Sequence, residues 1–339
     1  MHRTNWTIRL LALLAALGLV AAACGDDDTS EAADDTSSAS ASAESDGDES
    51  TETAMDEDAV EDEAAGDFPV TIESDGGTWT IEAAPERIVS LSPTATEILF
   101  AIGAGDQVIA ADAFSDYPPE APTTELSGFD PNVEAVTAFE PDLVVIANDA
   151  NELVASLTAL DIPVLVSPAP PDLEQGFDEM AAIGLATGRV DETAEAVASL
   201  RAELADAFSD APDVPARVYH ELDETFFSAS SNSFIGAVYA ELGASNIADE
   251  ADTDGFGFPQ LTEEYIVDAD PEIIVITDQV SYTADDLAAR PGWDQLTAVR
   301  AGNIVTVDAD IASRWGPRLP QFVIAISEAL STVEAGAGG

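Results

Sequence analysis

Ile273-Ile274-Val275-Ile276 is an unbroken run of four β-branched residues in the C-terminal half of the chain. Such a run is typical of a strand that is buried on both faces of a mainly parallel sheet. Short apolar runs of this kind alternate with segments of helical periodicity along most of the sequence. We therefore predict strands at residues 88–91, 108–111, 143–147, 164–167, 218–222, 226–229, 273–277 and 304–307.

A long helical segment separates these strands into two groups. Residues 191–211 carry apolar side chains at helical spacing, and Pro212 ends the pattern. Strands separated by helices define an α/β fold. We predict two Rossmann-like lobes, at residues 68–190 and 212–334, joined by this long backbone helix, with a ligand cleft between the lobes.

The N-terminal residues have the features of a secretion signal. Residues 1–23 combine two arginines with a short apolar run and end in three alanines, so we interpret them as a lipoprotein signal peptide. Cys24 follows directly, and its lipidation would hold the protein on the extracytoplasmic face of the cell membrane. The alternative is a plain secretion signal. Metabolic labelling with a fatty-acid probe tests the lipidation, which must disappear in Cys24→Ala.

Residues 24–67 form an acidic segment between the signal peptide and the predicted lobes. They contain 18 acidic residues and no basic residue, largely among Ser, Thr, Ala and Gly. Low hydrophobicity with high net charge does not offset the entropy that ordering would cost. We therefore predict a disordered tether that repels itself and extends.

The acidic character extends over the whole chain. The sequence has 67 Asp and Glu against 10 Lys and Arg, and its formal net charge is −57. Such a surface repels polyanions, so nucleic acid is excluded as a partner, and contact with the membrane is expected only through the lipid anchor.

Residues that usually carry catalysis or bind metals are scarce. Cys24 is the only cysteine, and His220 is the only histidine after the signal peptide. A bare zinc or manganese site and an iron–sulfur cluster are therefore not expected. The sequence also lacks a Gly-x-Ser-x-Gly turn and a Walker loop. We predict a protein that is not an enzyme and has no cofactor.

Several motifs, taken in order, resemble those of the helical-backbone metal-chelate receptors, the class III periplasmic binding proteins for cobalamin, ferric siderophores and haem. They are Arg87-Ile88-Val89-Ser90-Leu91-Ser92-Pro93-Thr94-Ala95-Thr96-Glu97-Ile98-Leu99, Phe114-Ser115-Asp116-Tyr117-Pro118-Pro119-Glu120-Ala121, Pro141-Asp142-Leu143-Val144-Val145, Arg290-Pro291-Gly292-Trp293 and Trp315-Gly316-Pro317-Arg318-Leu319. The resemblance spans about residues 85 to 332 and is closest to the cobalamin-binding branch. It implies a monomeric receptor that captures a corrinoid and delivers it to an ABC permease with its ATPase.

The same resemblance implies a set of ligand-binding residues. Aromatic rings offer flat apolar surfaces to a corrin ring, and charged side chains bind its polar arms. For Arg314 the alternative is a salt bridge with a neighbouring carboxylate. The implied residues are Phe114, Phe129, Phe227, Phe258, Asp310, Arg314 and Trp315.

Two glutamates match a different function of the family. Glu134 and Glu264 correspond to the acidic residues, one on each lobe, that dock onto arginines of the permease. Charge complementarity of this kind orients and accelerates encounter. The alternative is a solvated glutamate that complements the dipole of a helix N-terminus.

The sequence leaves two alternative functions open. In the first alternative, the protein belongs to the same family but binds a ferric siderophore or haem. Haem binding favours a Tyr or His side chain as iron ligand, and an anionic siderophore favours several basic residues. A protein of another class, a non-transport lipoprotein scaffold, predicts a cleft that is filled by its own side chains.

Overall fold

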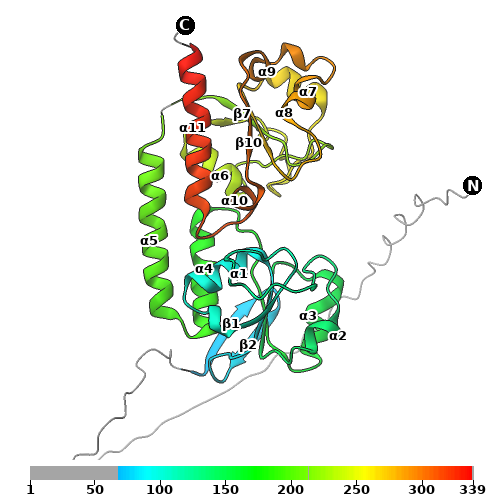
Figure 1. Cartoon of the computed structure of the whole chain (residues 1–339), viewed down its shortest axis with the longest axis vertical. Coiled ribbons are helices and arrows are strands. Elements are labelled where there is room, and N and C mark those ends of the chain that lie inside the picture. Colours follow the sequence, from blue (N-terminus) through cyan, green and yellow to red (C-terminus); the bar gives the residue numbers. More distant parts are fainter. Residues whose placement is uncertain (1–67, 213, 338–339) are drawn as a thin grey trace, which may run out of the picture. The chain divides into compact units, whose positions relative to one another are not determined.

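The computed structural model describes residues 68–212 and 214–337 (Figure 1). The predicted signal peptide, Cys24 and the acidic tether lie outside the described residues. Within the described ranges, no helix is both long enough and apolar enough to cross a bilayer.

The N-terminal lobe is built on a four-stranded parallel sheet with the strand order β4-β3-β5-β6. A hairpin precedes this sheet in the chain. The strands are β1 Val70–Ser74, β2 Gly77–Ile81, β3 Ile88–Leu91, β4 Val108–Ala111, β5 Leu143–Ile146 and β6 Val164–Val166. The helices are α1 Pro93–Ala101, α2 Val133–Thr137, α3 Leu153–Thr158 and α4 Leu173–Thr187, with short 3₁₀ turns at Gly105–Gln107 and Ala150–Glu152.

The C-terminal lobe repeats the same strand order, β10-β9-β7-β8, again with all strands parallel. The strands are β7 Arg217–His220, β8 Ser245–Asn246, β9 Ile273–Thr277 and β10 Ile304–Val307. The helices are α6 Phe234–Glu241, α7 Glu263–Ala269, α8 Ala284–Ala288, α9 Thr297–Ala301, α10 Ala309–Ser313 and α11 Leu319–Ala337, with a 3₁₀ turn at Trp293–Gln295.

Seven of the eight predicted strands are confirmed, with ends that move by at most two residues. The strand predicted at 226–229 is wrong. Phe226 has a left-handed backbone with φ of 67°, which interrupts an extended run, and only Phe227 forms an isolated bridge, with Gln260. The short strand β8 occupies the edge of the sheet beside β7 instead.

A layer of helices connects the two lobes. α5, at Val190–Ser209, lies where the sequence predicts the linking helix, and it packs against both α4 and α11 (Figure 1). Its buried residues include Leu200 and Leu204, which recur at helical spacing.

One hydrophobic core extends from the helical layer into both lobes. In β9, Ile273 and Val275 face this shared core, whereas Ile274 and Ile276 face a separate core on the other side of the sheet. The β5 strand of the other lobe alternates in the same way. Both faces of each central strand are therefore buried, which explains the unbroken apolar runs of the sequence.

The strand order determines where a ligand can bind. In each sheet the first strand, β3 or β7, lies between the second and the third, so the direction of strand addition reverses there. Open parallel sheets bind ligands outside the carboxyl ends of the strands at such a reversal point. The residues that follow the strands are therefore expected to form the ligand site.

Candidate functional site

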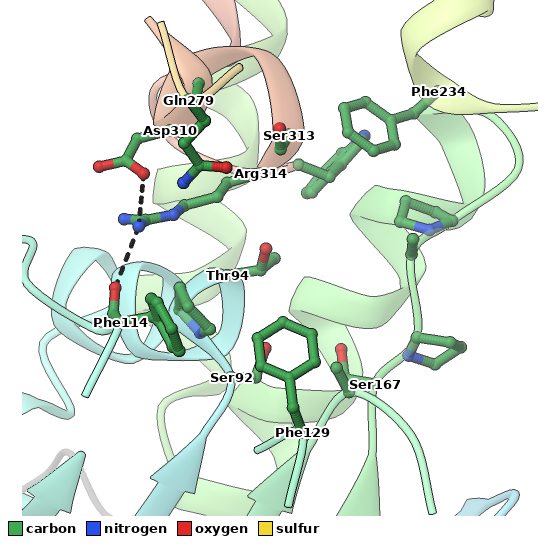
Figure 2. A pocket seen from close by; sticks show the side chains of 17 residues that line it. Ser92, Thr94, Phe114, Phe129, Ser167, Phe234, Gln279, Asp310, Ser313 and Arg314 are labelled. Atoms are coloured by element: carbon green, nitrogen blue, oxygen red, sulfur yellow. Dashed lines mark hydrogen bonds and ion pairs between the residues drawn. The ribbon is translucent and has the colours of Figure 1, made fainter. Parts of the chain in front are cut away.

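A cavity of about 310 Å³ opens among the loops that follow the strands (Figure 2). Its volume lies at the lower end of the range for small-molecule sites. Most of its walls are hydrocarbon, with a few hydroxyl and amide groups and two charged side chains. The residues that line it are Ser92, Pro93, Thr94, Phe114, Phe129, Ala147, Ser167, Pro168, Ala169, Pro170, Phe234, Gln279, Ala309, Asp310, Ser313, Arg314 and Trp315.

Both lobes contribute to the cavity. On the N-terminal side, Ser92 follows β3, Ala147 follows β5 and Ser167 follows β6. On the C-terminal side, Gln279 comes two residues after β9, and Ala309 comes two residues after β10. The cavity thus lies at the carboxyl ends of both sheets, as the strand order requires.

The wall formed by Phe114 is fixed by buried hydrogen bonds. Thr96 Oγ1 lies 2.8 Å from Ser90 Oγ and 3.0 Å from Ser115 Oγ, which joins α1 and β3 to the loop after β4. Asp112 Oδ1 accepts a hydrogen bond from Ser115 Oγ at 2.7 Å. Because these groups are all buried and paired, they hold the loop that presents Phe114.

Phe114 and Phe129 form an exposed aromatic pair at the cavity. Their rings meet edge to face with centroids 5.6 Å apart, and their side chains are directed into the cavity in Figure 2. Phe129 is 74% exposed, which is unusual for a large apolar side chain. Gly128 allows this arrangement, because a Cβ there would lie 2.2 Å from the carbonyl oxygen of Leu91.

Trp315 lines the cavity but is almost completely buried. It is only 2% exposed and meets Phe177 of α4 edge to face, with ring centroids 5.3 Å apart. Its ring lies directly over Gly176, where a Cβ would come within 1.9 Å of Cε2. Trp315 is therefore mainly a packing residue, which supports the cavity wall through its contacts with α4.

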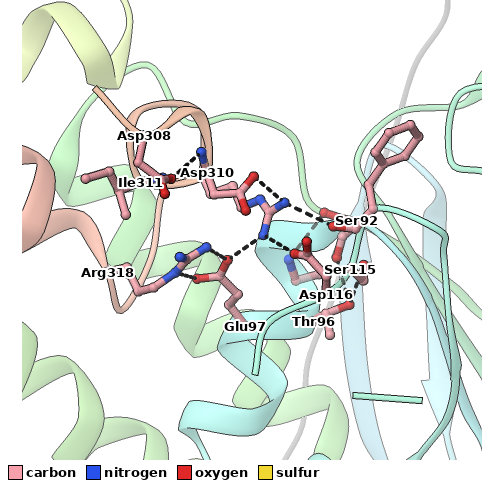
Figure 3. Close-up of polar contacts among 12 residues, drawn as sticks. Ser92, Thr96, Glu97, Ser115, Asp116, Asp308, Asp310, Ile311 and Arg318 are labelled. Atoms are coloured by element: carbon pink, nitrogen blue, oxygen red, sulfur yellow. Dashed lines mark hydrogen bonds and ion pairs between the residues drawn. The ribbon is translucent and has the colours of Figure 1, made fainter. Parts of the chain in front are cut away.

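Arg314 connects the two lobes through carboxylates, and Figure 3 labels three of them, Glu97, Asp116 and Asp310. Its Nη1 donates to Glu97 Oε1 at 3.0 Å and to Asp116 Oδ1 at 3.2 Å. Its Nη2 donates to the carbonyl oxygen of Phe114 at 3.0 Å and pairs with Asp310 Oδ1 at 2.6 Å. The alternative considered for Arg314, a salt bridge with neighbouring carboxylates, is thus present in the structure.

Arg318 belongs to the same cluster. It forms a two-point ion pair with Glu97, at 2.8 and 2.5 Å, and its guanidinium lies 4.2 Å from the centroid of the Tyr117 ring. The hydrogen bonds to Glu97 raise the pKa of Arg318. Burial raises the pKa of Asp310, while the Arg314 guanidinium acts in the opposite direction.

Two of the predicted ligand-binding residues do not line the cavity. Phe227 is 38% exposed, and Phe258 packs against Phe256 with ring centroids 6.1 Å apart. Phe227 follows Phe226, which has a left-handed backbone, and Phe258 follows Gly257, which also has a positive φ, of 91°. The cavity wall of that lobe comes instead from Phe234 and from residues after β9 and β10.

Several lining residues are absent from the sequence-based prediction. Ser92 and Ser167 directly follow strands and Gln279 comes two residues after one, so the rule about carboxyl ends was sufficient to find them. Phe234 is the first residue of α6 and comes 14 positions after β7, and no local pattern marks it as a wall residue.

The predicted docking residues are exposed in the first turns of two short helices. Glu134 is in the first turn of α2, and Glu264 is in the first turn of α7. The helix N-caps are Asn132 and Thr262, whose side chains accept backbone hydrogen bonds. The two glutamates belong to different lobes, as the resemblance implies.

His220, Tyr239, Tyr265 and Tyr282 form hydrogen bonds within the protein, whereas the ring of Tyr117 is 41% exposed beside Arg318. His220 is buried, its Nδ1 lies 2.8 Å from the hydroxyl of Tyr239, and burial lowers the pKa of the imidazole to about 4. Tyr265 donates to the carbonyl oxygen of Ile247. Tyr282 donates to Glu221. Within the described ranges, no three or more His, Cys, Asp or Glu side chains are grouped to hold a metal ion.

Comparison with known proteins places the chain in a family. It matches the family described as periplasmic binding protein over residues 88–311. It is 34% identical over 265 residues to a cobalamin-binding protein of Halobacterium salinarum, which covers 74% of this chain and 71% of the relative. It is 31% identical over 276 residues to the uncharacterized ABC transporter substrate-binding lipoprotein YvrC of Bacillus subtilis, covering 78% and 86% of the two chains.

A solved structure supports the same conclusion. The periplasmic heme-binding protein RhuT of Roseiflexus sp. RS-1, in apo form, has a TM-score of 0.66 and 26% identity, covering 73% of this chain and 99% of its own. The chain therefore belongs to the periplasmic binding protein family, whose members are non-enzymatic solute carriers. The predicted two-lobed α/β fold is confirmed.

Proposed function

We propose that this protein captures a corrinoid outside the cytoplasm and delivers it to the permease of an ABC importer. The observation that carries the proposal is the cavity between the lobes, whose walls are mainly hydrocarbon and include the exposed rings of Phe114 and Phe129. A corrin ring is a large disc with neutral amide arms, and such a disc matches flat apolar surfaces with scattered hydroxyl and amide groups. The similarity to a cobalamin-binding protein supports the choice.

The cavity takes only part of such a ligand. At about 310 Å³ it is smaller than a corrinoid, so the remainder would extend over the exposed faces of Phe114 and Phe129. An edge of the disc with its arms would enter the cavity and meet Ser92, Ser167 and Gln279. A scaffold without a solute predicts a filled cleft, and this cavity argues against that class.

Haem or a ferric siderophore is the second candidate, favoured by the fold similarity to RhuT. Among the described residues that line the cavity, none is a tyrosine or a histidine, so no wall residue supplies the usual iron ligands of haem. The arginine of the wall is paired with carboxylates, which disfavours an anionic chelate. We therefore place the corrinoid first.

Calorimetric titration of the chain without its signal peptide, with Cys24→Ala to prevent lipidation, tests the proposal. We expect cyanocobalamin to bind, and Phe129→Ala to weaken binding by about tenfold because an aromatic contact surface is lost. Phe256→Ala is the matched control, since Phe256 is also 74% exposed but does not line the cavity. Binding of haem or a ferric siderophore alone would reassign the ligand.

Docking to the permease is proposed for Glu134 and Glu264. Both are exposed, and they lie one on each lobe. We expect Glu134→Ala with Glu264→Ala to reduce corrinoid uptake at least tenfold while leaving ligand affinity unchanged, because the contacts orient encounter rather than hold the ligand. Substituting Glu195 and Glu203, which are exposed on α5, provides a control with the same loss of charge. Unchanged uptake in the docking variant would refute the assignment.

Attachment to the membrane is proposed through a lipid on Cys24, with residues 24–67 as the spacer. The YvrC relative is described as a lipoprotein, which supports this arrangement. The fatty-acid labelling of Cys24 described above is its test.

A further inference from the structure

Every terminal nitrogen of Arg314 is already paired within the protein. Three hydrogen bonds and one ion pair engage Nη1 and Nη2, with Glu97, Asp116, the carbonyl oxygen of Phe114 and Asp310 as partners. The side chain is only 11% exposed. Arg314 is therefore a neutralised part of the cavity wall and differs from a free guanidinium that awaits an anion.

The cluster as a whole is negative. Glu97, Asp116 and Asp310 supply three carboxylates, whereas Arg314 and Arg318 supply two guanidiniums, so one negative charge is left over. The excess negative charge lies on the solvent-accessible carboxylates of the cluster. Glu97 is 2% exposed, whereas the side chains of Asp310 and Asp116 are 29% and 65% exposed. Among the residues that line the cavity, the charged side chains are Asp310 and Arg314.

The free-energy cost of binding at Arg314 and Asp310 therefore differs between an anionic ligand and a neutral ligand. A carboxylate or catecholate must displace Asp116 or Asp310 from Arg314, and the displaced carboxylate then remains close to the ligand's own charge. A primary amide instead donates an N–H to an Asp310 oxygen and leaves the ion pairs intact. Asp310 borders the cavity, and Figure 2 shows it on the same side of the cavity as Gln279.

We infer that Asp310 and Asp116 make this site select chelates without net negative charge, with Asp310 as the specificity-determining residue of the wall. The inference rests on the proposed function, which it narrows to corrinoids whose side arms are amides rather than acids. Arg314 then positions these two carboxylates and joins the lobes, and it does not bind a ligand anion.

The test compares cyanocobalamin with the monocarboxylate obtained by hydrolysing one of its propionamide arms, a ligand pair that differs by one charge at nearly constant shape. We expect the wild-type chain to prefer the amide by about tenfold at low salt, with a smaller preference at high salt. Asp310→Asn combined with Asp116→Asn is expected to reduce the preference below about threefold, mainly by improving binding of the acid. The single variant Asp310→Asn should show the larger part of this change, and Asp116→Asn the smaller part.

The control for a single variant removes one negative charge elsewhere. Asp206→Asn changes an exposed residue of α5 and should keep the full preference for the amide. Equal affinity of the wild-type chain for both ligands, or an unchanged preference in the double variant, overturns charge selection while the proposed function stands. Failure of both ligands to bind overturns the proposed function. In that case haem, which has two carboxylates, and its uncharged dimethyl ester replace the corrinoid pair in the same comparison. Tighter binding of haem than of the ester also overturns charge selection.

Discussion

Glu97→Ala is expected to lower the free energy of unfolding by about 3–5 kcal/mol, which is the usual cost of removing one partner from a buried ion pair. Glu97 is 2% exposed and accepts hydrogen bonds from both Arg314 and Arg318, whose side chains are only 11% and 12% exposed. Without Glu97, two largely buried guanidiniums lose their common partner. Because Glu97 belongs to α1 and both arginines follow α10, the same change weakens the connection between the lobes.

Urea unfolding of the wild-type chain and of Glu97→Ala measures this difference in the free energy of unfolding. Glu174→Ala is the matched control, because Glu174 also forms a two-point ion pair with an arginine, Arg201, but at the surface, with side-chain exposures of 71% and 44%. An exposed pair of this kind is screened by water, and its loss should change stability little. A loss of stability no larger in Glu97→Ala than in Glu174→Ala would show that the interlobe cluster is not a strong connection.

Gly176→Ala is expected to destabilise the protein by about 2–3 kcal/mol and to weaken ligand binding about tenfold or more. Replacing glycine by alanine inside a helix normally stabilises it by up to about 1 kcal/mol, so the sign of the change is itself informative. At this position the new Cβ would lie 1.9 Å from Cε2 and 2.2 Å from Cζ2 of Trp315. Trp315 is 2% exposed, packs on Phe177 and lines the cavity, so we expect the displaced ring to move toward the cavity.

Thermal unfolding and calorimetric titration together test this prediction. Trp315→Phe in the Gly176→Ala background should recover part of the stability, because the smaller ring leaves room for the methyl group. Ala181→Met is the control on the same helix, since Ala181 is exposed and a longer side chain there meets solvent. A Gly176→Ala chain that is as stable as the wild type and binds equally well would contradict the packing role of Trp315.

The predictable part of the site was set by local sequence. The family resemblance implied Phe114 and Phe129 as ligand-binding residues, and both line the cavity. The same resemblance implied Phe227 and Phe258, but they lie outside the cavity walls, next to the positive-φ residues Phe226 and Gly257. Matching a motif places a residue along the chain, whereas its direction in space depends on backbone angles that the motif does not contain.

The sequence by itself determined the alternation of strands and helices, the parallel sheets and the long linking helix, because hydrophobic periodicity acts between residues a few positions apart. Only the tertiary structure decided the state of Arg314. Its partners Glu97 and Asp116 lie 217 and 198 positions away, so the sequence left open whether this arginine binds a ligand anion or pairs with carboxylates of the protein. The electrostatic potential at the cavity is the sum over charged groups that folding brings together. The preference for ligands without net negative charge therefore depends on how the two lobes pack.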